Sequence, residues 1–148
     1  SFISAWLDLT VLRWLLGSAS VFIAVGALGF VASGAEHSMS MGSTSMLLGL
    51  FPVNVLHNAV HLAFGVWGLF AGRARGSAIV YALGSGAAYL VLAIVGLLSP
   101  MLFGMVPIGG YDILLHLVLA VVLAGTGFWA AWFAPQQVSG ANKAKRAA

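Results

Sequence analysis

Four long apolar runs without charged residues alternate with short polar stretches along the chain. The runs cover about 14–33, 46–71, 77–98 and 113–133, and the stretches between them are rich in Gly, Ser, Pro or Arg. A helix needs about 20 apolar residues to cross about 30 Å of hydrocarbon, so each run is long enough for one transmembrane helix. Because the connections are short, we expect neighbours in sequence to pack antiparallel. The pattern predicts an all-α fold, a bundle of four transmembrane helices.

The basic residues indicate how this bundle is oriented. All six Lys and Arg residues lie before the first run, between the second and third, or after the fourth: Arg13, Arg73, Arg75, Lys143, Lys145 and Arg146. Short basic loops stay on the cytoplasmic side of a membrane, so both termini are predicted to be cytoplasmic (N-in/C-in). The expected organisation is an interfacial N-terminal arm (1–13), a transmembrane domain (14–133) and a basic cytoplasmic tail (134–148).

The composition excludes several classes of protein. Hydrophobic residues make up 61% of the chain and charged residues 6%, whereas a soluble domain carries about 25% charge. This excludes a soluble enzyme and a nucleic-acid binder, and no soluble substrate is evident. The absence of Cys excludes disulfides and thiolate sites. We therefore expect a multi-pass protein of a bacterial inner membrane, cytoplasmic or photosynthetic, whose partners are lipids and other membrane-protein subunits.

The second apolar run carries the most informative polar residues. At 100° per residue, Asn54, His57, Asn58, His61 and Gly65 share one face of a helix. If that helix begins with the run, both imidazoles lie near the middle of the membrane. A polar side chain without a partner is costly there, so this face is predicted to meet protein, water or a cofactor.

The fourth run offers a matching set. Asp112 and His116 are four residues apart, which places a carboxylate beside an imidazole on one helical face. The segments 58–65 and 112–120 share an amide or acid, then a His-Leu pair, then a small residue four positions after the His. This similarity predicts a polar face joining the second and fourth helices, and a two-fold internal repeat of helix pairs. Tyr89, in the third run, is expected to pack beside this face or to hydrogen-bond with it.

Three interpretations of these buried polar groups remain open. They can be packing groups that hydrogen-bond between helices. Alternatively, a neutral imidazole of His57, His61 or His116 binds a haem iron, a chlorophyll magnesium or a metal ion. In the third interpretation, Asp112, His116 and His61 form a proton or ion relay.

A fourth interpretation concerns the stretch between the first two runs. His37, Met39, Met41 and Met46 combine an imidazole with thioethers, which are soft ligands suited to Cu(I). The same Met residues can equally fill a flexible loop at the interface.

Three segments carry a resemblance to a known family. The strings at 26–30, 51–65 and 112–120 resemble an uncharacterised family of small four-helix bacterial membrane proteins, catalogued as a domain of unknown function. The resemblance extends over about 15–133 and implies the fold and the membrane location, but no activity. It also implies recurring polar positions, which here are Asn58, His61 and His116. The chain departs from the family pattern in Ala120, where Gly is commoner, and in its longer Met-rich loop.

Taken together, the sequence predicts a small non-enzymatic accessory subunit of a larger photosynthetic or respiratory membrane complex. If a pigment or haem is bound, His61 and His116 are the expected ligands, with His57, Asn58 and Asp112 as further site residues. The alternative is a stand-alone protein that binds copper through the outer loop or conducts protons.

Overall fold

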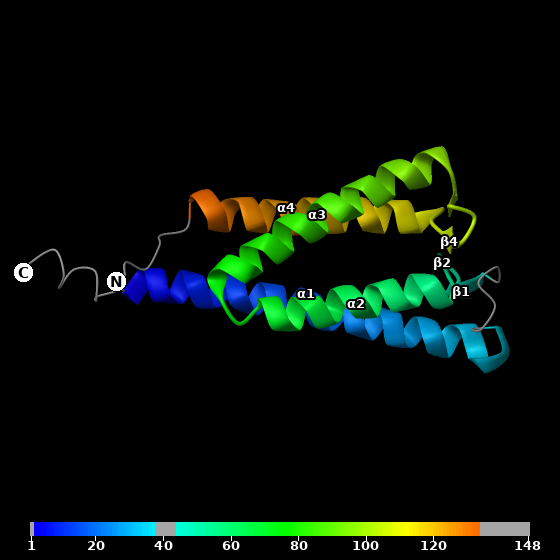
Figure 1. The fold of residues 1–148 in the computed structure, drawn as a ribbon, viewed down its shortest axis with the longest axis horizontal. Coiled ribbons are helices and arrows are strands. Elements are labelled where there is room, and N and C mark those ends of the chain that lie inside the picture. The colour runs from blue at the N-terminus through cyan, green and yellow to red at the C-terminus, as the bar shows by residue number, and fades with distance from the viewer. Residues whose placement is uncertain (1, 38–43, 134–148) are drawn as a thin grey trace, which may run out of the picture.

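The computed structural model describes residues 2–37 and 44–133, which form four helices and two short hairpins (Figure 1). The helices are α1 (Phe2–His37), α2 (Val55–Ala71), α3 (Arg75–Leu98) and α4 (Tyr111–Trp132). The strands are β1 (Ser45–Leu47), β2 (Phe51–Val53), β3 (Met101–Leu102) and β4 (Val106–Pro107). The predicted all-α class is confirmed, although the hairpins were not foreseen.

The chain folds as two units of the same design. In each unit, two helices pack along one another and are joined by an antiparallel hairpin: α1 and α2 through β1–β2, α3 and α4 through β3–β4. Both hairpins lie at the same end of the molecule (Figure 1), which we call the hairpin end. The opposite end carries Arg13 on α1 and the α2–α3 turn with Arg73, and we call it the basic end. The units meet at the hairpin end, where β2 contacts β4, α2 contacts β4 and α4 contacts β2, and along α3, which contacts both α1 and α2.

The two hairpins repeat each other residue by residue. Each position in the second lies 55 residues after its counterpart in the first, so that Pro107 corresponds to Pro52 and Gly104 to Gly49. Gly49 and Gly104 share a φ of +70°, and the residues before them, Leu48 and Phe103, have φ of 57° and 52°. The same spacing relates His61 to His116 and His57 to Asp112. The predicted internal repeat of helix pairs is therefore present in the backbone as well as in the sequence.

Two helices begin at different residues from those expected. The second was predicted to start at residue 46, but α2 begins at Val55 because the preceding residues form the β1–β2 hairpin. The sequence had placed His57 near the middle of the membrane, on the assumption that the helix begins with the apolar run. In the structure, His57 lies in the first turn of α2. The predicted N-terminal arm and the first span form one continuous helix, α1.

Three helical segments are long and apolar enough to cross a membrane. They are Leu12–Ser33 within α1, the whole of α3 and the whole of α4. Helix α2 has 17 residues, which is the lower limit for a span, so a bundle of four full spans is supported only in part. The tail at 134–148 lies outside the described residues.

Glycines allow the helices of each unit to approach closely. A Cβ added to Gly29 of α1 would lie 2.0 Å from the Asn58 side-chain oxygen on α2. In the second unit, a Cβ on Gly86 of α3 would lie 2.6 Å from the backbone nitrogen of Ala124 on α4. Neither position has room for a side chain, as expected for small residues at contacts between membrane helices.

Candidate functional site

Helix α2 starts with an asparagine cap that also connects the two units. The Asn54 side-chain oxygen accepts a hydrogen bond of 2.9 Å from the backbone N–H of His57. This satisfies one of the free N–H groups at the start of the helix. The Asn54 amide nitrogen donates across the interface to the Met105 carbonyl oxygen at 2.6 Å. The first turn of α2 is thereby held against the β3–β4 hairpin.

His57 is oriented by a backbone carbonyl of the other unit. Its Nδ1 lies 3.1 Å from the carbonyl oxygen of Pro107. A carbonyl oxygen only accepts, so the neutral ring carries its proton on Nδ1 and keeps a lone pair on Nε2. That Nε2 lies 3.0 Å from Nε2 of His61, one turn further along α2.

His61 lies between His57 and a tyrosine of α3. Because His57 Nε2 has no proton to give, His61 Nε2 donates to it in the neutral pair. On the other side of the ring, the Tyr89 hydroxyl lies 3.5 Å from His61 Nδ1 and can donate to it. A metal at His61 Nε2 would require the ring proton to move to Nδ1, where the Tyr89 oxygen is placed to accept it.

His116 is contributed by α4, together with a carboxylate. Its Nδ1 lies 3.3 Å from Oδ2 of Asp112, and both side chains are only 2% exposed. The two atoms are within ion-pair distance, but their orientation makes no hydrogen bond, and neither has another hydrogen-bond partner among the described residues. A carboxylate beside Nδ1 leaves Nε2 as the ring nitrogen available to a ligand.

The three imidazoles converge on one small buried cavity. Each of His57, His61 and His116 offers a ring nitrogen, and these nitrogens all lie within 4.8 Å of one another. The cavity has a volume of about 60 Å³, and Tyr89 and apolar side chains complete its wall. It lies near the hairpin end, since the β3–β4 hairpin supplies part of the lining.

This arrangement has the features of a three-histidine metal site. Imidazole ligands lie 2.0–2.1 Å from zinc, so two ligands of a tetrahedral site are about 3.3 Å apart. The Nε2 atoms of His57 and His61, 3.0 Å apart, are already close to that spacing, and the ligand nitrogens of all three rings lie within 4.8 Å of one another. Metal-binding histidines also use their second nitrogen for a carbonyl, carboxylate or similar group. Here His57 has Pro107, His116 has Asp112 and His61 has Tyr89.

The cavity is small for a flat macrocycle. Pockets for organic ligands occupy about 300–1,000 Å³, whereas this one offers about 60 Å³. Ring nitrogens so close together surround a single ion and leave no space between them for a haem or a chlorophyll. Of the ligands considered from the sequence, the geometry therefore favours a metal ion without a macrocycle over a haem or a chlorophyll.

The structure brings together four of the predicted site residues: His57, His61, Asp112 and His116. It places Asn58 elsewhere, with its amide nitrogen 3.4 Å from Ser33 Oγ on α1. Asn58 is fully buried but does not line the cavity, because it points towards the other helix of its own unit.

The predicted copper loop is described only at its edges. His37 is the last residue of α1, and its side chain lies outside the described part of the structure, as do Met39 and Met41. Met46, on β1, is 53% exposed.

Two residues orient the site in ways that the sequence pattern did not predict. Pro107 acts through its backbone carbonyl, which no side-chain pattern reveals. Asn54 was assigned to the polar face of a longer helix, but an Asn directly before an apolar periodic segment is also a typical helix cap.

These features define a class of protein: a helical membrane protein built from two helix–hairpin–helix units, with a buried histidine cluster where the units meet. A family model described as Domain of unknown function (DUF4383) matches residues 13–129, and the chain belongs to this family. No curated protein and no solved structure matches the chain. The family resemblance seen in the sequence is thereby confirmed, and the function has to be inferred from the site.

Proposed function

We propose that this protein binds one first-row transition-metal ion within the membrane, through His57, His61 and His116. The observation that carries the proposal is the convergence of three buried imidazoles on one cavity, each with a second group beside its other ring nitrogen. Neutral imidazole suits Zn²⁺, Cu²⁺ and Ni²⁺. With no thiolate and an apolar wall around the imidazoles, we expect Zn²⁺ or Cu²⁺ to bind most tightly.

The proposed role is binding, not catalysis. His57 and His61 belong to the first unit and His116 to the second, so an ion at this position would join the two units. We further propose that the protein serves as an accessory subunit of a larger membrane assembly. Nearly all of its described residues lie in or beside apolar helices, which leaves little surface outside the membrane for other partners.

The predicted proton relay through Asp112, His116 and His61 is less well supported, because no hydrogen bond among the described residues joins His116 to either of the other two. The series from Tyr89 through His61 and His57 ends at the Pro107 carbonyl oxygen. A backbone carbonyl has no proton to pass on. These hydrogen bonds therefore serve to orient the rings.

The test is metal binding by the purified protein in mild detergent. After treatment with a chelator and its removal, titration with Zn²⁺ should give one equivalent per chain. His57→Ala, His61→Ala and His116→Ala should each weaken binding by about 100-fold or more, since losing a ligand exceeds the about 10–100-fold typical of losing a supporting group.

The chain provides its own control in its fourth histidine. His37→Ala should leave the Zn²⁺ affinity unchanged if the buried cluster is the site. If His37→Ala abolishes binding and His61→Ala does not, the outer loop is the site and the proposal is wrong. An absorption band of haem or chlorophyll that is lost in His61→Ala or His116→Ala would show that the histidines bind a pigment and that the proposed ion site is wrong.

The accessory role is tested separately, by extraction of native membranes in mild detergent. Co-purification with other membrane subunits at fixed stoichiometry is the expected result. A monodisperse homo-oligomer alone would contradict this part of the proposal without affecting the metal site.

A further inference from the structure

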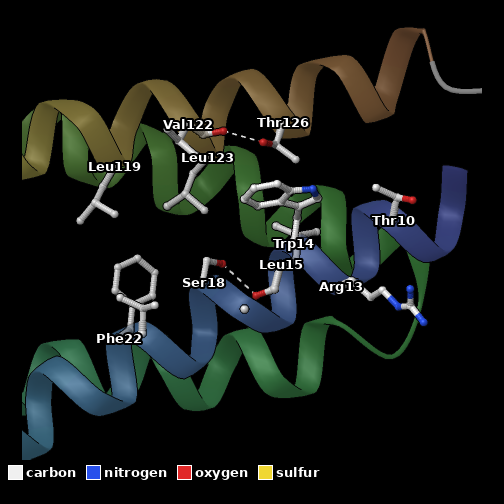
Figure 2. Close-up of a pocket in the computed structure, with 12 residues that line it drawn as sticks. Thr10, Arg13, Trp14, Leu15, Ser18, Phe22, Leu119, Val122, Leu123 and Thr126 are labelled. Carbon is white, nitrogen blue, oxygen red and sulfur yellow. Dashed lines mark hydrogen bonds between the residues drawn. The ribbon is translucent and has the colours of Figure 1, made fainter.

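A second, larger hollow is a crevice between α1 and α4, which belong to different units. It has a volume of about 700 Å³, and its lining residues all belong to these two helices. Figure 2 shows Trp14, Ser18 and Phe22 of α1 facing Leu119 and Leu123 of α4 across it. This crevice is separate from the histidine cavity and more than ten times larger.

The walls of the crevice are apolar although they include hydroxyl groups. Ser18 donates to the Leu15 carbonyl oxygen at 2.8 Å, and Thr126 donates to the Val122 carbonyl oxygen at 2.7 Å (Figure 2). Both hydroxyl protons are thus used within their own helices. The crevice is therefore long and apolar, and a molecule bound in it does not have to accept hydrogen bonds from these hydroxyl groups.

The charged group of the crevice lies at its end towards the basic end. Thr10, Arg13 and Trp14 line it there, and Arg13 is the only charged residue in the lining. Trp is typical of the membrane–water interface, and a guanidinium is well suited to phosphate. The distribution matches a molecule with an anionic head and a hydrocarbon chain.

The length of the crevice matches a lipid chain. From Thr10 to Phe22 the crevice follows α1 for about 18 Å at 1.5 Å per residue, slightly more than the about 15 Å of one leaflet's hydrocarbon. The crevice is therefore long enough for an extended acyl chain that reaches from the interface to the middle of the membrane.

We propose that the crevice between α1 and α4 is a binding site for one anionic phospholipid, with an acyl chain between the helices and the phosphate at Arg13. The crevice ends at Phe22, whose ring stacks on Tyr89 at a centroid distance of 5.3 Å. Tyr89 in turn lines the histidine cavity. The bound chain would thus reach to within two aromatic rings of the proposed metal site.

Gly17 makes a clean test possible. It lines the crevice, and a Cβ at this position would meet no atom within 4 Å. Gly17→Leu should therefore fill the crevice without disturbing the helix, in which Leu is also favoured over Gly. Gly125→Leu is the matched control, since a Cβ there also meets no atom within 4 Å and Gly125 does not line the crevice.

The experiment is native mass spectrometry of the full chain, delipidated and then titrated with phosphatidylglycerol or phosphatidylcholine. The unaltered protein should retain one phosphatidylglycerol in preference to phosphatidylcholine. Gly17→Leu should weaken that binding at least tenfold, while Gly125→Leu should leave it unchanged. Arg13→Gln should remove the preference for phosphatidylglycerol.

Three results would overturn the proposal. The first is equal retention of phosphatidylglycerol by Gly17→Leu and the unaltered protein. The second is equal retention of both lipids by the unaltered protein. The third is recovery of a polypeptide, and not a lipid, from the crevice of protein extracted from native membranes. Circular dichroism of both glycine variants serves as the check that the helices are intact.

Discussion

At the scale of single residues, the site depends on what holds each imidazole in place. His57 has a backbone carbonyl beside its second nitrogen, His61 a hydroxyl and His116 a carboxylate. Asp112 is the one acidic group among these three, and it is 2% exposed. A buried carboxylate without a strong partner is costly, so Asp112 is the supporting residue whose removal is most informative.

We predict that Asp112→Asn weakens Zn²⁺ binding by about 10–100-fold without abolishing it, because the amide keeps the shape but loses the charge beside His116. The measurement is calorimetric titration of the purified variant. Ser20→Ala is a suitable control, since Ser20 is exposed and does not line the cavity. Loss of all binding in Asp112→Asn would mean that the carboxylate is itself a ligand.

At the scale of helices, close packing within each unit positions the site. Gly29 of α1 leaves the space that Asn58 of α2 occupies. Asn58 lies one residue after His57 on α2. The distance between α1 and α2 therefore also affects where the imidazole of His57 points. A side chain at this contact would force the two helices apart.

Gly29→Ala should lower the free energy of unfolding by about 1–3 kcal/mol, the usual cost of overpacking. Gly17→Ala is the matched control on the same helix. Nothing lies within 4 Å of its added Cβ, so it should be neutral or stabilising by up to about 1 kcal/mol. Thermal unfolding in detergent, followed by circular dichroism, measures both. Equal melting temperatures for the two variants would contradict this account of the packing.

The sequence predicted these elements to different degrees, for physical reasons. The length of the apolar runs was sufficient to predict that four helices exist. The helical spacing of the polar residues was sufficient to predict that His57 and His61 share a face. They did not reveal the hairpins, because a strand of two or three apolar residues looks the same as the start of an apolar helix. The meeting of His61 with His116 was predicted from matching patterns, whereas the Pro107 carbonyl depends on backbone placement alone.

At the scale of the whole molecule, two units joined by one turn meet through their hairpins and through contacts of α3 with α1 and α2. The crevice shows that they do not close together along α1 and α4. An ion held by histidines from both units would add a further connection between them.

Removing the metal should consequently lower the thermal stability of the protein. A ligand present at 100 times its Kd contributes about 2.7 kcal/mol, which corresponds to about 5–10 °C in a chain of this size. The measurement is the melting temperature before and after chelation, with Zn²⁺ added back to restore it. His61→Ala should melt at the same temperature with or without the chelator. An equal loss in that variant would mean that the chelator acts elsewhere.

The 55-residue repeat has a consequence for the composition of the site. Two identical copies of one unit, paired about an axis, would supply equivalent groups in even numbers. Two copies of the first unit, each with His57 and His61, would bring together four imidazoles. Two copies of the second unit, each with Asp112 and His116, would bring together two imidazoles and two carboxylates. Three imidazoles with one carboxylate require the counterparts His57 and Asp112 to differ. The site therefore depends on the two units having become different in sequence, and identical copies of either unit do not form it.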